Sequence, residues 1–174
     1  MKFIVKLFFC FFILNSYAQQ SLTYQKPSEE ILELADVDLA PGVQIDSKGE
    51  QMVLLYRDQY KSIAELSETE LRLAGLRINP ITNIGSRTSY ITNLKVKKTK
   101  DKDPKQVMGL PDNPRLSGFR WSPDESMIAC LNTTPRGVEV WVLDIDKAMV
   151  TKLTGATVNA NMGSTINWFK DNEH

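Results

Sequence analysis

The stretch Phe119-Arg120-Trp121-Ser122-Pro123-Asp124 decides how the fold of this chain is interpreted, together with the apolar run Met127–Leu131 that follows it. Trp121 supplies a large apolar ring that two stacked sheets can cover. Pro123 presets φ for a turn, and the Asp124 side chain can bond the backbone two residues further on. The combination of an aromatic residue, a tight turn and an alternating apolar run predicts a β-hairpin.

Two further strand-like runs follow this hairpin. Val138–Leu143, which contains Trp141, comes after a polar break at Asn132–Gly137. Met149–Leu153 comes after a second break at Asp144–Lys147. Short strands joined by tight turns predict a β-meander.

The same pattern occurs earlier in the chain. Asp46-Ser47-Lys48-Gly49 makes a turn before the strand signal Met52–Tyr56. In this alignment Ile45 corresponds to Trp121, Ser47 to Pro123, Met52 to Ile128 and Leu54 to Cys130. A third copy begins at Trp168-Phe169-Lys170-Asp171, which repeats the Trp-x-x-Asp spacing.

The spacing of the copies indicates a repeat architecture. Trp121 and Trp168 are 47 residues apart, about the length of one four-stranded propeller blade. We therefore predict a mainly β fold with two antiparallel four-stranded blades, the start of a third and two short helices. The expected partial propeller covers residues 43–174, with units that start near residues 45, 121 and 168.

The first unit carries an insertion and the chain before it carries a helix. Ser28 and the acidic residues after it predict a short helix that ends near Ala35, within an N-terminal extension of residues 19–42. Ser67-Glu68-Thr69-Glu70 has the spacing of a capping box, which predicts a helix over Ser67–Ala74. Ser89–Lys97 alternates well enough for a strand, and the lysine-rich segment Lys95–Lys105 is interpreted as a solvated loop.

Composition excludes several classes of function. Hydrophobic residues make up 42% and charged residues 24%, as in globular proteins. Lys+Arg and Asp+Glu are balanced at 21 each, so no excess charge points to nucleic acid as a partner. No cofactor is indicated, and a metal-dependent enzyme is disfavoured because the chain has one histidine and two cysteines. Cys130, in an apolar strand, is expected to be a small buried hydrophobe.

The N-terminus predicts export. Lys2 and Lys6 are followed by the apolar run Leu7–Leu14 and by a small-x-small site that ends at Ala18. This is the pattern of a signal peptide over residues 1–18, with cleavage between Ala18 and Gln19. The run is too short to span a bilayer, so no stable membrane span is expected after cleavage, although a retained anchor is the alternative. The expected location is periplasmic or extracellular.

Several motifs in order resemble the N-terminal propeller of prolyl-oligopeptidase-type serine peptidases, and most closely the glutamyl endopeptidase-like branch. The resemblance covers nearly all of residues 24–172, and its most specific part is Leu73-Ala74-Gly75-Leu76-Arg77-Ile78. The other motifs that carry it are Tyr24-Gln25-Lys26-Pro27, Ile63-Ala64-Glu65-Leu66, Gly109-Leu110-Pro111 and Trp121-Ser122-Pro123-Asp124.

The resemblance implies that the chemistry of the family belongs to a C-terminal α/β-hydrolase domain with a serine, an aspartate and a histidine. This chain has no Gly-x-Ser-x-Gly elbow, and its one histidine is the last residue, His174. A nucleophilic serine needs a base held in fixed geometry, which a fraying end does not supply. We therefore expect a non-catalytic chain and assign no catalytic residue.

The implied role is that of a propeller fragment, which in the intact secreted peptidase gates and positions peptide substrates. The implied partners are the hydrolase domain and the remaining blades, which this chain lacks, and the peptide substrate. The chain is then expected to be a truncated gene product, a pseudogene fragment or one half of a split gene. The alternative from another class is a non-enzymatic periplasmic binding or scaffold module with a propeller-like fold.

Overall fold

The computed structural model describes residues 25–171. The chain divides into two compact units, with the boundary between Val37 and Asp38. The first unit contains helix α2 (Glu29–Ala35), which confirms the predicted helix. Ser28 lies at its N-cap, but its side chain makes no capping hydrogen bond, contrary to expectation. The predicted signal peptide and its cleavage site at Ala18 and Gln19 lie outside the described residues. In residues 25–171 no helix is both long and apolar enough to cross a bilayer.

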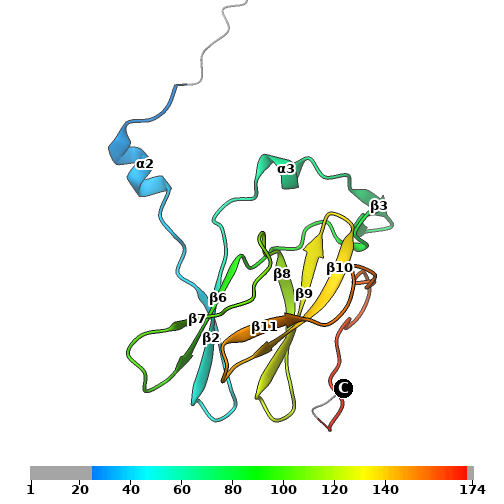
Figure 1. Cartoon of the computed structure of the whole chain (residues 1–174). Helices are drawn as coiled ribbons and strands as arrows, with labels where there is room; N and C mark the ends of the chain where they lie inside the picture. The colour runs from blue at the N-terminus through cyan, green and yellow to red at the C-terminus, as the bar shows by residue number, and fades with distance from the viewer. Residues whose placement is uncertain (1–24, 172–174) are drawn as a thin grey trace, which may run out of the picture. The chain divides into compact units, whose positions relative to one another are not determined.

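The second unit is mainly β and contains two four-stranded antiparallel sheets in which the strands follow chain order (Figure 1). Sheet A consists of β1 (Gly42–Ile45), β2 (Gln51–Tyr56), β6 (Asn93–Lys98) and β7 (Lys105–Gln106). Sheet C consists of β8 (Leu116–Trp121), β9 (Met127–Thr134), β10 (Gly137–Asp144) and β11 (Met149–Lys152). The predicted meander in residues 116–153 is therefore confirmed.

The two sheets share one register, strand by strand, except at a β-bulge between Ser117 and Arg120 of β8. Ile45 lies opposite Met52 in sheet A, as Trp121 lies opposite Ile128 in sheet C. The equivalence continues across both sheets. In sheet A, Leu54 lies opposite Lys95, which lies opposite Gln106. In sheet C, Cys130 lies opposite Trp141, which lies opposite Lys152. The correspondence that the sequence predicted between Ile45 and Trp121 is therefore the structural one.

The turns at the ends of the first hairpins are equivalent as well. The backbone N–H of Asp46 donates to the Gln51 carbonyl, and that of Ser122 donates to the Met127 carbonyl. Position four of the turn is left-handed in both, with φ of 69° at Gly49 and 61° at Glu125. The Glu125 carboxylate accepts hydrogen bonds from the backbone N–H and the hydroxyl of Ser47, so it ties one turn to the other.

The main core lies between the two sheets. We call the face of sheet C toward sheet A its front face; it carries Trp121, Ile128, Cys130, Trp141 and Leu143. The face of sheet A that meets it is the back face of sheet A; it carries Val53, Leu55, Leu94 and Val96. Ile128, Cys130, Val53 and Leu94 are fully buried, so these two faces form the tightest part of the molecule. Trp121 is partly buried against this core, as the sequence predicted.

A smaller core covers the opposite, back face of sheet C. Leu131 and Val138 pack there against Ile84 and against the C-terminal segment 158–166. Residues 168–171, where a third repeat was expected to start, form no strand. The indole N–H of Trp168 donates to the Arg120 carbonyl at 3.0 Å, which fastens this segment beside β8.

The insertion between β2 and β6 differs from its prediction. Residues 67–74 were expected to be a helix, but helix α3 spans Ile63–Leu66, and the capping box is formed by Ser62 and Glu65. Sheet B follows, made of β3 (Leu71–Leu73), β4 (Leu76–Asn79) and β5 (Ile84–Gly85). The predicted strand at Ser89–Lys97 is confirmed only from Asn93 on.

A backbone turn and a set of side-chain hydrogen bonds explain why the helix prediction was wrong. Ala74 and Gly75 both have positive φ, 47° and 92°, so they form a two-residue hairpin turn and end any helix there. The Glu70 carboxylate, which was expected to cap, instead accepts hydrogen bonds from Ser86 at 2.6 Å and Arg77 at 2.9 Å. These bonds hold the carboxylate against sheet B rather than against a helix N-terminus.

Candidate functional site

The blade-motif residues form the turn that the sequence predicted. The Ser122 hydroxyl donates to the Asp124 carboxylate at 2.7 Å, and the Asp124 carboxylate accepts the backbone N–H of Ser126 at 3.1 Å. The hydrogen bond from Ser122, followed by those from Ser126, lowers the pKa of Asp124. Pro123 and Asp124 are exposed and Ser122 is buried, so these contacts stabilise the hairpin.

The other two tryptophans have separate local roles. The Trp141 indole N–H donates to the buried Glu139 carboxylate at 2.8 Å, and Lys152 pairs with the same group. Burial alone would raise the pKa of Glu139, but the hydrogen bonds from Lys152 and Trp141 hold it below its usual value. Trp168 bonds the backbone next to Trp121, whereas Asp171 is exposed at the end of the described chain. The residues of the blade motif therefore stabilise strands and turns at separate places and do not come together at one site.

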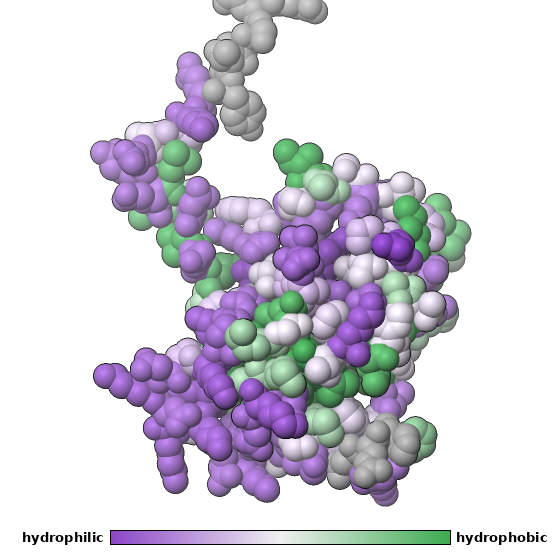
Figure 2. Space-filling model, viewed as in Figure 1, coloured by the Kyte–Doolittle hydropathy of each residue, from purple (hydrophilic) through white to green (hydrophobic). Residues whose placement is uncertain are grey.

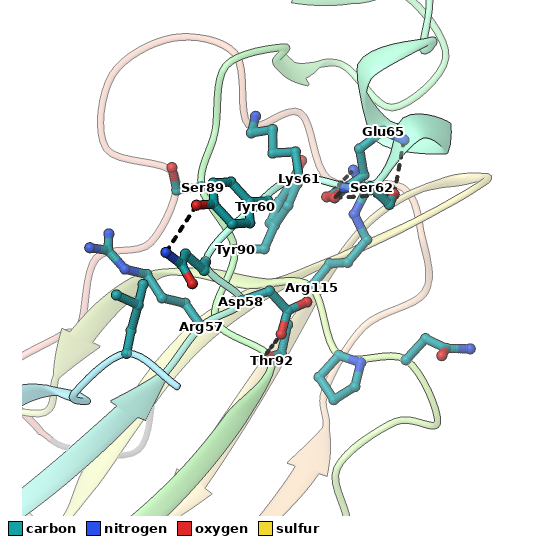
Figure 3. Close-up of a pocket in the computed structure, with 14 residues that line it drawn as sticks. Arg57, Asp58, Tyr60, Lys61, Ser62, Glu65, Ser89, Tyr90, Thr92 and Arg115 are labelled. Carbon is teal, nitrogen blue, oxygen red and sulfur yellow. Dashed lines mark hydrogen bonds and ion pairs between the residues drawn. The ribbon is translucent and has the colours of Figure 1, made fainter. Parts of the chain in front are cut away.

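A cleft of about 570 Å³ lies at the end of the sheets opposite the β1–β2 and β8–β9 turns. It is lined by residues 57–62 after β2, residues 89–92 before β6 and residues 113–115 before β8. Figure 3 shows Tyr60, Tyr90 and Arg115 around it, beside α3. The cleft therefore exists because the insertion leaves sheet A and returns to it at this end.

Arg115 is the best-anchored side chain of the cleft. Its guanidinium donates to Glu68 at 2.9 Å, lies 3.8 Å from Glu65 and stacks 4.3 Å from the centre of the Tyr90 ring. Burial would lower the Arg115 pKa, but the hydrogen bond that Arg115 donates to Glu68 and the charges nearby raise it. The Nε atom of Arg115 is buried and makes no hydrogen bond in the described part of the chain.

Some other polar side chains of the cleft make hydrogen bonds within the chain, and others are exposed. Asp58 accepts a long hydrogen bond from Thr92 at 3.3 Å, and the Lys61 ammonium donates to the Thr88 carbonyl at 3.0 Å. The exposed Arg57 guanidinium makes no hydrogen bond or ion pair with residues 25–171, and it points away from Arg115 in Figure 3. Tyr60 is 70% exposed, so an open cation and an aromatic ring border the cleft.

The side chains around the cleft are of types that can bind a ligand. Arginine, lysine and tyrosine side chains recognise carboxylates, backbone carbonyls and apolar side chains of a ligand. Cys130 lies in the core, where burial raises the pKa of its thiol to about 12, as expected for a buried hydrophobe. Within residues 25–171 no group of three or more His, Cys, Asp or Glu side chains is placed to hold a metal ion.

Sequence reasoning missed the cleft. Arg115, Tyr90 and Glu68 are distant in sequence, and only the long connection between β2 and β6 brings them together. The available signal was a tyrosine near each end of that connection, Tyr60 and Tyr90.

Comparison with known proteins adds a distant relationship. The chain is 26% identical over 139 residues to a protein of Arabidopsis thaliana named "Probable glutamyl endopeptidase, chloroplastic", a match that covers 75% of this chain. It is 25% identical over 133 residues to a protein of the same name from Oryza sativa subsp. japonica, over 71% of this chain. The match spans only 14% of the length of either relative.

No protein-family model and no solved structure matches the chain. The similarity therefore points to a peptidase-related origin, in agreement with the resemblance that the sequence motifs showed. It reaches only a small part of proteins that are much longer than this chain.

Proposed function

We propose that sheets A and C are two consecutive blades of a β-propeller, and that this propeller belongs to an exported serine peptidase of the glutamyl endopeptidase-like branch. The observation that carries the proposal is the shared strand order and register of the two sheets, interrupted only by the bulge in β8, with one sheet stacked on the other. A propeller repeats one four-stranded antiparallel unit in this way. The distant similarity to proteins named as glutamyl endopeptidases supports the peptidase part.

In this proposal the chain itself is non-catalytic, and the cleft helps to position peptides for a hydrolase domain elsewhere in the intact protein. Arg57 and Tyr60 are exposed at the rim, where a peptide carboxylate or carbonyl group can reach them. Arg115 is held by two glutamates, so its role is to shape the wall rather than to bind the ligand directly.

Peptide binding tests the positioning role. A fluorescein-labelled peptide rich in glutamate should bind the purified chain, measured by fluorescence anisotropy. Arg57→Glu should weaken binding about tenfold, since it replaces an attractive charge with a repulsive one. Lys100→Glu makes the same charge change in the exposed β6–β7 connection and should leave binding unchanged. Equal effects of the two substitutions would contradict a role for the cleft.

A serine-directed fluorophosphonate probe tests the non-catalytic part. The purified chain should not be labelled and should not hydrolyse the same peptide. Stoichiometric labelling of any serine would overturn this part, because it would require an activated nucleophile within the chain.

One observation favours a second candidate, a self-contained binding module of the cell envelope. The back face of sheet C is already covered by Ile84 and by the segment 158–166, so this sheet has both faces covered. A monomeric chain with a sharp, cooperative thermal transition above about 60 °C, beyond the middle of the range for mesophilic domains, would favour this candidate.

A further inference from the structure

We propose that the exposed front face of sheet A is a docking surface, and that its occupant is the back face of another four-stranded sheet of the same repeat. This inference deepens the propeller part of the proposed function and rests on it. It does not depend on the peptidase assignment.

The stacking of sheets A and C is head to tail. The front face of sheet C, with Trp121, Ile128 and Cys130, lies on the back face of sheet A. By the shared register, the equivalents of these three residues in sheet A are Ile45, Met52 and Leu54. They lie on the opposite side of sheet A from its back face, so the same kind of face is covered in one sheet and open in the other.

The open face is apolar over the edge strand β1 and its neighbour β2, and basic over β6. Val43 is 51% and Ile45 is 54% exposed, and they lie opposite Leu54 and Met52. On the neighbouring strand β6, Lys95 and Lys97 occupy the positions that Trp141 and Leu143 fill in sheet C. The Lys95 ammonium lies 5.1 Å from the centre of the Tyr56 ring, so its stem covers part of the apolar surface.

The existing interface defines the occupant. Because sheet C presents its front to the back of sheet A, a further sheet that continues the series must present its back to the front of sheet A. Contacts between unlike faces form open series or closed rings. The back face of sheet C, which carries Leu131, Val138 and Val140, is an example of this occupant within the chain itself.

A second copy of the chain can therefore serve as the probe. Partner one is the full chain, whose front face on sheet A is open. Partner two ends at Thr154, which removes the segment over the back of sheet C, and carries Ile45→Lys to block its own front face. Mixed at about 100 µM, they should form a one-to-one complex in sedimentation velocity, whereas each alone should remain monomeric. Hydrogen exchange in partner one should slow at residues 43–54.

Matched substitutions in partner one locate the contact. Ile45→Lys should weaken the complex at least about tenfold, since it puts a charge in the apolar part of the docked face. Ile81 is 64% exposed in the insertion, and Ile81→Lys should have no effect. If the shortened partner does not fold, a full-length version with Val158→Asp and Ile166→Asp frees the same back face.

The absence of a complex between folded partners would overturn the proposal, as would an Ile45→Lys variant that binds normally. Because no peptide is present, this outcome is independent of the peptide-binding test above. Failure of peptide binding alone would leave the docking surface in place, and failure of docking alone would leave the cleft in place.

Discussion

Sheets A and C have the same order of four strands, and their register agrees except at the bulge in β8, yet their side chains meet different surroundings. In sheet C the central strand β9 is almost entirely buried, because a sheet covers its front and residues 84 and 158–166 cover its back. In sheet A only the back face is covered. The comparison teaches that the hydrogen-bonding pattern of a repeat is set locally, whereas burial depends on what each sheet is stacked against.

The sheets also differ at the connection between their second and third strands. In sheet C, β9 and β10 are joined by the short turn Pro135-Arg136, whereas in sheet A residues 57–92 hold α3 and sheet B. Figure 2 shows apolar side chains exposed over α3 and β3, and a strongly hydrophilic region at the β6–β7 connection on the lower left. The insertion builds the cleft, so the functional difference between the two sheets lies in one connection.

The largest expected effect comes from truncating equivalent residues of the two front faces. Ile128→Ala should lower the free energy of unfolding by about 2–5 kcal/mol, because Ile128 is fully buried between the sheets. Met52→Ala at the equivalent position should cost about 1 kcal/mol, since Met52 is only partly buried. Urea unfolding followed by tryptophan fluorescence measures both. Equal losses would mean that the front face of sheet A is covered in solution.

Thiol reactivity compares the same two faces through a reaction rate instead of a free energy of unfolding. Cys130 should react with a maleimide at pH 7.5 at least about 100-fold more slowly than a cysteine at the equivalent position, introduced as Leu54→Cys with Cys130→Ala. Both proteins carry Cys10→Ser, so that one thiol is followed at a time. Unfolding in urea should remove the difference. A Cys130 that reacts fast in the folded protein would contradict its burial in the core.

A smaller effect is expected at the left-handed turn position. Glu125 has φ of 61°, and at such a φ a residue other than glycine destabilises the fold by about 1 kcal/mol relative to glycine. The Glu125 carboxylate also accepts hydrogen bonds from the backbone N–H and the hydroxyl of Ser47. Glu125→Gly relieves the backbone but loses these bonds, so stability should change by less than about 1 kcal/mol. Glu125→Ala loses the bonds without relief and should be less stable than Glu125→Gly by about 1 kcal/mol.

The equivalent residue Gly49 provides the control for this turn. Its φ is 69° and no atom lies within 4 Å of an added Cβ, so Gly49→Ala should cost only the backbone strain, about 1 kcal/mol. Thermal melting of the four proteins measures these differences. A Glu125→Ala variant as stable as Glu125→Gly would show that position 125 is not left-handed.

The smallest effect concerns the insertion that sheet C lacks. Hydrogen bonds from Ser86 and Arg72, with Arg77, lower the pKa of Glu70 to about 2. A lowered folded pKa stabilises the folded state while the group is ionised, so this contribution is present above the unfolded value of 4.5 and is lost as the pH falls toward 2. At pH 6 the wild-type protein should have a higher urea midpoint of unfolding than Glu70→Gln. The difference between the two midpoints should disappear as the pH falls from 4.5 toward 2. A gap that does not change with pH would contradict it.

Much of the fold could be predicted from the chain because its decisive signals are local. Pro123 and Asp124 define a turn through their own backbone geometry, and alternation defines the strands on either side. The internal repeat from Ile45 and Trp121 could be aligned correctly because a hairpin of constant length keeps its register. The helix expected at Ser67–Ala74 was wrong because residues 62–70 contain two Ser-x-x-Glu segments, and only the tertiary contacts of Glu70 decide which of them caps a helix.

The sequence by itself determined most strands of sheets A and C, the turns between their first strands and the resemblance to a peptidase propeller, since all three depend on residues near one another or on motifs in a fixed order. The tertiary structure alone decided which faces are buried and where the cleft lies. Arg115 meets Glu68 and Tyr90 only after the insertion folds back over the sheet ends. Ile45 and Trp121 occupy equivalent positions, and one is exposed while the other packs into the core, because only one of their sheets has a neighbour on that side.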